Sequence, residues 1–287
     1  MLTLVRRNKK SKPASKNGTP GKTRAATADR HDLYQKAVQE PEADVRFFNR
    51  VYRATYGKRP HFLREDFCGT GHLSCTWVAD HSKNIAVGYD LDPDPIEWGK
   101  KHCLSQLKPA QQSRVKYIEG NALDNSKNKA DIIAALNFSY FCFKEREQLK
   151  AYFKAAYKNI AAKGLFILDI EGGPETQQEG QETRFVDDAD CTYVWTQGPF
   201  DAINNYAVCT IGFRFDDGSE IKRAFRYDWR IWQAPEVTDL LKEVGFKTAH
   251  VYWEGTDPDT DEGNGVFTKK DKAENCDAWI AYIVAAK

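Results

Sequence analysis

A glycine turn between a short apolar run and a helical pattern constrains this 287-residue chain most. The motif opens at residue 61 with a short apolar and aromatic run, which predicts a strand, and residues 72–80 carry apolar side chains at helical spacing. Between them, the segment Cys68-Gly69-Thr70-Gly71 lacks two Cβ atoms, so a ligand can approach the backbone there. A strand, a glycine turn and a helix together aim helix N-terminal N–H groups at a bound nucleotide or carboxylate.

An acidic residue follows at the distance that suits a nucleotide site. Residues 85–89 predict a second strand, and Asp90 ends it nineteen residues after Gly71. The two oxygens of a carboxylate match two neighbouring ribose hydroxyls, so Asp90 is a candidate for binding a ribose. Two cofactor classes use this geometry, and the dinucleotide fingerprint needs a third glycine where Ser74 stands.

The same segment resembles the glycine motif of class I S-adenosylmethionine (SAM) methyltransferases, in which an acid precedes alternating glycines. The matching residues are Glu65-Asp66-Phe67-Cys68-Gly69-Thr70-Gly71. Phe67 stands where the first glycine of the motif usually lies. The resemblance covers roughly residues 31–287 and implies a SAM-dependent methyltransferase.

Strands and helices alternate through the middle of the chain. Further strands are predicted at residues 115–119, 130–136 and 165–170, and a long amphipathic helix at about 144–162. This alternation predicts an α/β fold, doubly wound, with helices on both faces of a mostly parallel sheet. A helix at 235–244 and strands at 248–253 and 278–285 close the chain.

The alternation is interrupted after the fifth strand. Three β-type runs, at 191–196, 206–215 and 220–229, are joined by short turns and predict an antiparallel meander within about 191–232. Together with the resemblance, this implies a seven-stranded methyltransferase sheet with an antiparallel insertion. Such an insertion is typical of family members that act on small molecules.

The N-terminus differs in charge from the rest of the chain. Residues 1–30 hold nine Lys or Arg and one Asp, a local charge of +8, which leaves −7 for residues 31–287 against a total of +1. We expect a disordered basic tail at 1–30 and one domain at 31–287, which opens with a helical cap at 31–57 divided at Pro41. A nucleic-acid arm or a targeting segment is the alternative for the tail.

Composition indicates the compartment. Seven cysteines include no C-x-x-C pair and leave one over, which argues against a disulfide framework or a zinc cluster. No stretch approaches the roughly 18 apolar residues of a membrane span, and the basic N-terminus lacks the apolar core of a secretory signal. The six histidines show no metal spacing, and the acidic run 257–261 reads as a solvated loop. We expect a cytoplasmic protein without a metal.

The resemblance assigns roles to the glycine turn and the acids beside it. Gly69, Thr70 and Gly71 would cradle the methionine part of SAM. Glu65 would approach the amino group of SAM through water, and Asp90 would bind the ribose.

The resemblance also implies cofactor contacts at the other strand ends and in the helical cap. Leu91 would pack on the adenine, and Asn121 with Ala122 would meet its edge. The backbone at Asn137 would meet the amino group of SAM. Tyr34, in the helical cap, would close over the cofactor, with a simple core position as an equal alternative.

Methyl transfer requires positioning and the removal of a proton from the acceptor. Tyr140, Asp169 and Glu171 are candidates for this role because they lie near predicted strand ends. Residues 137–140 (Asn-Phe-Ser-Tyr) partly match the Asn-Pro-Pro-Tyr motif of nucleic-acid amino methyltransferases but lack both prolines. Together with the acidic body, this makes a nucleic-acid acceptor the second choice.

The insertion is expected to select the acceptor. Tyr140, Tyr193, Trp195 and Arg226 are the candidate acceptor contacts. The alternatives are that the aromatic residues fill an interface and that the arginines are solvated or paired with nearby Asp residues.

Three functions compete on the sequence alone. The first is a SAM-dependent methyltransferase acting on a small molecule, for which the basic tail is the one segment where nucleic acid could bind. The second is an NAD-dependent oxidoreductase, weakened by Ser74. The third is a binding protein that keeps the fold without turnover.

Overall fold

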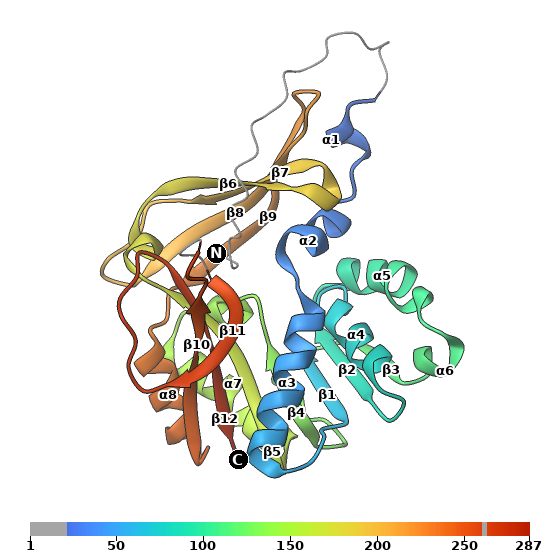
Figure 1. The fold of residues 1–287 in the computed structure, drawn as a ribbon, viewed down its shortest axis with the longest axis vertical. Coiled ribbons are helices and arrows are strands. Elements are labelled where there is room, and N and C mark those ends of the chain that lie inside the picture. The colour runs from blue at the N-terminus through green and yellow to red at the C-terminus, as the bar shows by residue number, and fades with distance from the viewer. Residues whose placement is uncertain (1–21, 260–262) are drawn as a thin grey trace.

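The central strands of the main sheet, β1, β4 and β5, are largely buried on both faces. The structure is a computed structural model that describes residues 22–259 and 263–287. Its strands run in the order β11-β10-β12-β5-β4-β1-β2-β3 (Figure 1). Their bounds are β1 (Phe62–Asp66), β2 (Ile85–Asp90), β3 (Val115–Glu119), β4 (Ala130–Ala135), β5 (Ile160–Gly172), β10 (Thr248–Thr256), β11 (Gly263–Lys270) and β12 (Trp279–Ala286).

Strands β1 to β5 are parallel, and β12 lies antiparallel between β5 and β10. Strand β4 shows why helices cover both faces. Ile132 and Ala134 are buried in one core, and Ile133 and Ala135 in the other. The predicted doubly wound, mostly parallel α/β fold is confirmed.

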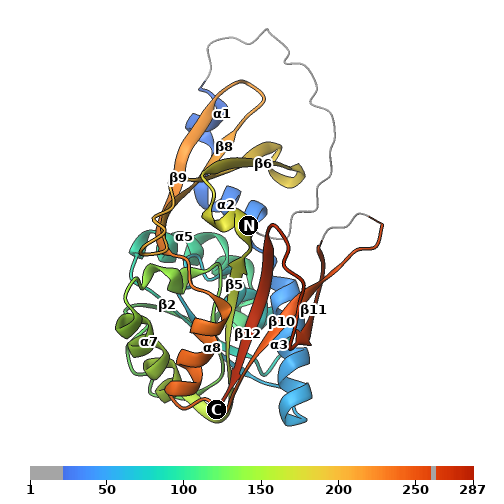
Figure 2. The same ribbon diagram turned by 90° about the vertical axis from the view of Figure 1, so that its left-hand side faces the viewer.

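Helices divide between the two faces of the sheet, as Figure 2 shows. Helices α3 (Pro41–Tyr56) and α4 (His72–Asp80) pack on one face, and α7 (Arg146–Asn159) and α8 (Ala234–Glu243) on the other. The other helices are α1 (Arg24–Thr27), α2 (Arg30–Val38), α5 (Pro93–His102) and α6 (Pro109–Gln112). Single 3₁₀ turns are η1 (Leu104–Gln106), η2 (Ser139–Cys142), η3 (Pro174–Gln177) and η4 (Asp187–Ala189).

The sequence explains where helices α2 and α3 begin and end. The Asp29 carboxylate caps α2 by accepting from the N–H groups of His31 and Asp32. Pro41 occupies the first turn of α3, where its missing N–H costs nothing, so the predicted division at this residue is confirmed. Gly57 ends α3 with a φ of 68°.

A second, antiparallel sheet lies beyond the carboxyl ends of the main strands (Figure 1). It contains β6 (Gly180–Val186), β7 (Cys191–Gln197), β8 (Tyr206–Arg214) and β9 (Glu220–Arg230) in that order. The three predicted runs correspond to β7, β8 and β9. The sequence analysis missed β6 because this edge strand is mostly polar and exposed, with only Val186 buried.

The main sheet has one strand more than predicted. The extra strand, β11, pairs antiparallel with the outer side of β10. Phe267 is its one buried residue, and the exposed Gly, Asn and Lys residues around it hide the alternation of a strand. The acidic run 257–261 lies partly outside the described residues.

The folded body begins before residue 31. Residues 1–21 of the predicted tail lie outside the described part of the chain. The Arg24 guanidinium forms ion pairs with Asp190 and Asp216, at 3.0 and 2.8 Å, and the backbone N–H of Arg24 donates to the Asp217 carboxylate. The boundary predicted at residue 30 therefore moves to Arg24 or earlier. Among the described residues, no helix is both long and apolar enough to cross a membrane.

Candidate functional site

The glycine turn has the left-handed backbone that its sequence suggests. Phe67, Gly69 and Gly71 have φ values of 58°, 50° and 64°. A Cβ atom built on Gly69 would meet nothing within 4 Å, so the space beside this residue is open. Gly71 immediately precedes α4, whose N-terminus therefore faces the turn. The arrangement leaves backbone accessible to a ligand.

Phe67 has the left-handed backbone conformation that a glycine at the first position of the motif would adopt easily. A left-handed φ is unfavourable for a bulky residue. The Phe67 ring packs edge-on against Phe143 and Tyr152, with ring centroids 6.0 and 5.4 Å apart. Aromatic packing therefore offsets the backbone strain and keeps the shape of the turn.

Neighbouring elements hold the turn at Thr70. The Tyr117 hydroxyl donates to the Thr70 carbonyl oxygen at 2.9 Å, and the Gln35 amide donates to the Thr70 hydroxyl at 2.7 Å. A Cβ atom on Gly99 of α5 would lie 2.0 Å from that carbonyl oxygen. Helices α2 and α5 and strand β3 thus pack directly on the turn.

Asp90 connects the end of β2 to the same turn. Its Oδ2 accepts from Gly69 N–H at 2.7 Å, and its Oδ1 accepts from Asp92 N–H at 2.9 Å. Leu91, which follows, is 66 % exposed. The carboxylate is therefore fixed beside Gly69, and its predicted contact with a ribose stays a prediction.

The end of β3 lies next to the end of β2. Asn121 is exposed, and its side chain accepts from Leu123 N–H at 2.9 Å. Ala122 is buried, and its carbonyl accepts from the fully buried Arg64 at 2.6 Å. Asn121 and Ala122 thus follow the strand next to Asp90, as the prediction for an adenine edge requires.

Glu65 is engaged within the protein. Its Oε2 accepts from the Ser74 hydroxyl at 2.6 Å and from Ser74 N–H at 3.0 Å. Burial, with the negative charges of Asp44 and Asp90, raises the pKa of Glu65 to about 8. Ser74, at the place of a third glycine, is thus the partner of Glu65. The predicted approach of Glu65 to the amino group of SAM stays a prediction.

Asp169 holds the loop after β4. Its two oxygens accept from the N–H groups of Asn137 and Phe138, at 2.6 and 2.9 Å. Both of these loop residues have a positive φ, of 57° and 53°. Burial, opposed by these two hydrogen bonds and supported by the charges of Asp44 and Glu171, raises the pKa of Asp169 to about 7.

Sequence reasoning missed Asp44, because it sits in the regular pattern of a helix with no motif around it. Asp44 lies in the first turn of α3 and accepts from the Tyr282 hydroxyl. Burial raises its pKa to about 7. Its charge acts on both Glu65 and Asp169, and Asp90 and Glu171 act on these two acids in turn. We call these five acids the carboxylate set: Asp44, Glu65, Asp90, Asp169 and Glu171.

Aromatic side chains from α2 and the insertion face one another near this set. The Tyr34 ring lies 4.8 Å from that of Phe225, and its hydroxyl lies near that of Tyr227. The charge of Asp169 also acts on Tyr34. Tyr193 and Trp195 share this inner face of the insertion, since β7 pairs with β8 through Tyr193–Phe213 and Trp195–Ile211.

Arg226 does not lie on the inner face of the insertion with Tyr193 and Trp195. Its cross-strand partner is Thr210, which pairs in turn with Thr196, so these side chains lie on the face opposite Trp195. Arg226 is exposed. The sequence analysis grouped it with Tyr193 and Trp195, and the alternation of side chains along β9 separates it from them.

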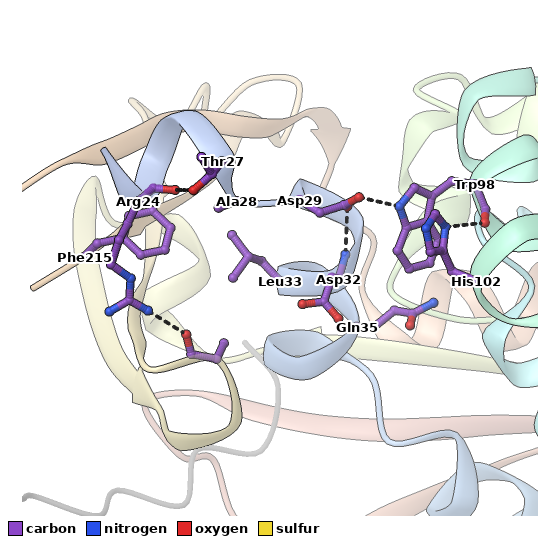
Figure 3. Close-up of a pocket in the computed structure, with 11 residues that line it drawn as sticks. Arg24, Thr27, Ala28, Asp29, Asp32, Leu33, Gln35, Trp98, His102 and Phe215 are labelled. Carbon is purple, nitrogen blue, oxygen red and sulfur yellow. Dashed lines mark hydrogen bonds between the residues drawn. The ribbon is translucent and has the colours of Figure 1, made fainter. Parts of the chain in front are cut away.

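The outer side of α2 borders a cavity of about 630 Å³ between α1, α5 and the insertion. Figure 3 shows Asp29 and Trp98 joined across it, with the indole N–H donating to the carboxylate at 2.6 Å. His102 stacks on Trp98 at 4.2 Å. None of the residues predicted to contact a cofactor lines this cavity.

Comparison with known proteins agrees with this architecture. No protein-family model and no curated protein matches the sequence. Among solved structures, a SAM-dependent methyltransferase from Clostridium acetobutylicum matches with a TM-score of 0.61 and 17 % identity, over 89 % of this chain and 96 % of that one. DesVI from Streptomyces venezuelae matches with a TM-score of 0.64 and 13 % identity, over 90 % and 98 %.

A third structure was solved with SAM bound. It is CalS10, an amino pentose methyltransferase from Micromonospora echinaspora, with a TM-score of 0.63 and 14 % identity over 89 % of this chain and 95 % of that one. This chain has the class I methyltransferase fold. In this chain, the glycine turn and the ends of β2 and β4 meet at one edge of the sheet. Parallel α/β sheets bind ligands at this edge.

Proposed function

We propose that this protein is a SAM-dependent methyltransferase that acts on a small molecule. The observation that carries the proposal is the carboxylate set beside an open glycine turn. SAM bears a sulfonium and an ammonium, and buried carboxylates are stabilised by cations in direct contact. Open space at Gly69 and the fixed carboxylate of Asp90 suit the rest of the cofactor.

Bound SAM would supply an electrophilic methyl group. Asp90 would bind the ribose hydroxyls, and Gly69, Thr70 and Gly71 would present backbone to the methionine part. Asp44, Glu65 and Asp169 would provide the negative environment that the cationic ligand requires. Tyr34 on α2 would cover the ligand, because α2 packs on Thr70 through Gln35 and on the insertion through Tyr34.

The side chains of α2 and of the insertion, which lie over the strand ends, favour a small acceptor. Helix α2 and the insertion place aromatic side chains, including Tyr34 and Tyr193, close to the carboxylate set. A nucleic-acid backbone would meet this negative region unfavourably. Related folds include proteins described as sugar and amino pentose methyltransferases.

The negative charge of the carboxylate set also argues against NAD as the bound cofactor. A dinucleotide carries a pyrophosphate, which favours helix N-termini free of competing anions. Here the Glu65 carboxylate already accepts from Ser74 in the first turn of α4. Strand β12 also departs from an all-parallel nucleotide-binding sheet.

The test compares S-adenosylhomocysteine (SAH) with NAD in thermal melts of the full chain. A ligand at 100 times its dissociation constant stabilises the folded state by about 2.7 kcal/mol, which gives a clear shift. We expect SAH to raise the melting temperature and NAD to leave it unchanged. Labelled SAM supplied with metabolite pools then shows turnover. The proposal fails if NAD stabilises and SAH does not, and binding without turnover indicates a non-enzymatic protein.

A further inference from the structure

Tyr140 has a buried hydroxyl whose hydrogen-bonding capacity is unused. It lies in η2, directly after the loop that follows β4, and its side chain is 0 % exposed. The ring packs on Phe141 and Phe153, with centroids 5.0 and 6.3 Å apart. Within the described residues, its hydroxyl has no hydrogen-bond partner. Such a group is costly to keep in a folded protein, so a partner from outside the chain would account for it.

Two carboxylates near the end of β5 lie close to this part of the chain, because Asp169 accepts from the N–H groups just before η2 and Glu171 follows it by two residues on the same strand. After burial, the charges of Asp169 and Glu171 are what raise the pKa of Tyr140 well above its usual value. These two acids are 8 % and 5 % exposed. The three side chains are therefore nearly dry and carry acceptor oxygens, and we call them the Tyr140 subsite.

Aromatic rings of α2 and of the insertion lie near this subsite. The charge of Glu171 acts on Tyr193, and that of Asp169 acts on Tyr34. Tyr227 is stacked on Trp229 with centroids 4.5 Å apart. The π faces of such rings attract cations, most strongly where water is excluded. One guanidinium, of Arg184, is close, and it is already placed over the Tyr193 ring and bonded to the Ala37 carbonyl.

We propose that the acceptor is an amine and that its nitrogen binds in the Tyr140 subsite. The inference rests on the proposed methyl transfer and names the class of its substrate. An ammonium group offers N–H donors to the Tyr140 oxygen and to the carboxylates of Asp169 and Glu171. An alcohol offers a single donor and no charge, and a carboxylate acceptor would be repelled.

Methyl transfer from SAM to an amine can be written as a balanced reaction at this site. The bound ammonium gives one proton to the Asp169–Glu171 pair, and the freed lone pair of the nitrogen forms a bond to the methyl carbon. The electrons of the broken carbon–sulfur bond stay on sulfur, so the products are a thioether and a methylated ammonium. A pKa of about 7 at Asp169 suits proton acceptance near neutral pH.

Tyr140→Phe separates binding from a structural role. Because the hydroxyl has no partner within the described protein, its removal should leave the melting temperature unchanged or raise it. The KM for an amine acceptor should rise about tenfold, the loss expected for one hydrogen bond to a charged group, with SAH affinity unchanged.

The matched control is Tyr52→Phe. Tyr52 is also fully buried, but its hydroxyl donates to the Lys163 carbonyl at 2.6 Å, near the start of β5. This variant should lower the melting temperature and leave the amine KM unaltered. If Tyr140→Phe behaves like Tyr52→Phe, the hydroxyl is structural and the proposal is wrong.

A probe experiment needs no knowledge of the acceptor. The SAH complex of the full chain is melted with isopropylammonium, with its neutral isostere isopropyl alcohol, and with acetate. We expect only isopropylammonium to raise the melting temperature, by about 2 °C at several times its dissociation constant, and both Tyr140→Phe and Glu171→Gln to remove the effect.

The outcomes distinguish this proposal from the one on which it rests. Equal shifts with isopropyl alcohol, a shift with acetate, or a full response in Tyr140→Phe would overturn the amine subsite while SAH binding stands. Failure of SAH itself to stabilise the protein overturns the proposed function. In a turnover screen, O-methylated rather than N-methylated products would likewise exclude an amine acceptor.

Discussion

The glycine turn and the inner face of the insertion are built by different means. At the turn, backbone conformation and hydrogen bonds fix the polar groups, as in the bonds of Asp90 to Gly69 and of Glu65 to Ser74. On the inner face, strand alternation and ring packing fix the side chains, as with Tyr34 against Phe225. A backbone-defined site tolerates few changes, whereas a site lined by side chains can change its ligand one residue at a time.

This difference predicts where each ligand loses affinity. Changes at the turn should act on SAM, and changes on the inner face should act on the acceptor alone.

The largest effect is expected from Asp90→Ala. Loss of the carboxylate removes its proposed ribose contacts and frees Gly69 N–H, so SAH affinity should fall ten- to a hundredfold in calorimetry. Asp92→Ala is the control, because its carboxylate caps α5 at Asp94 N–H and should affect the melting temperature only. Equal SAH affinities for Asp90→Ala and the parent protein would remove Asp90 from the site.

A smaller loss is expected from Gly99→Ala. The new Cβ atom would collide with the Thr70 carbonyl oxygen, and overpacking of this kind costs about 1–3 kcal/mol. SAH affinity and melting temperature should both fall, because the turn must move. Gly180→Ala, which meets nothing within 4 Å, serves as the control. A Gly99→Ala protein with normal SAH binding would show that the turn is more adaptable than its contacts suggest.

On the inner face, Tyr193→Ala and Trp195→Ala should raise the acceptor KM severalfold, since each removes a large ring near the acceptor. SAH affinity should hold. Arg226→Ala, on the opposite face of the same sheet, should change neither value. Parallel losses for SAH and acceptor in the two aromatic variants would contradict the separation of the two regions.

The carboxylate set predicts a pH dependence. Asp44, Glu65 and Asp169 have pKa values raised to about 7, 8 and 7 in the folded protein, so the folded state binds more protons than the unfolded state. The stability of the ligand-free protein should therefore fall as the pH rises from about 4 to 8. A cationic ligand lowers these pKa values, so SAM binding at pH 7 should release protons. Calorimetry in buffers of different ionisation enthalpy measures this release, and proton uptake would contradict the arrangement.

The smallest effect concerns the N-terminus. Deleting residues 1–21 should leave the melting temperature unchanged, since that composition cannot form a core. Deleting residues 1–28 also removes Arg24 and its ion pairs with Asp190 and Asp216, so a fall of about 2–4 °C is expected. Equal melting temperatures for the two truncations would show that α1 adds nothing.

Much of the fold could be predicted because its signals are local. Buried strands such as β4 and the turn at Gly69 and Gly71 follow from short stretches of sequence. Edge strands could not be predicted, because β6 and β11 are polar and their pairing partners are distant in sequence. In the site, too, residues with a local sequence signal could be predicted, and residues that depend on distant packing could not. Asp90 ends β2 and Asp169 lies three residues before the end of β5, whereas Asp44 reaches the site only through helix packing. The face of Arg226 depends on strand register.

Helix α2 touches both regions at once. Gln35 donates to Thr70 in the glycine turn, and Tyr34, one residue earlier, packs on Phe225 of the insertion. A displacement of α2 that admits one ligand therefore alters the contacts made to the other. Linkage then requires a coupling free energy between the two binding events, and it is reciprocal: the factor by which cofactor changes acceptor affinity equals the factor by which acceptor changes cofactor affinity.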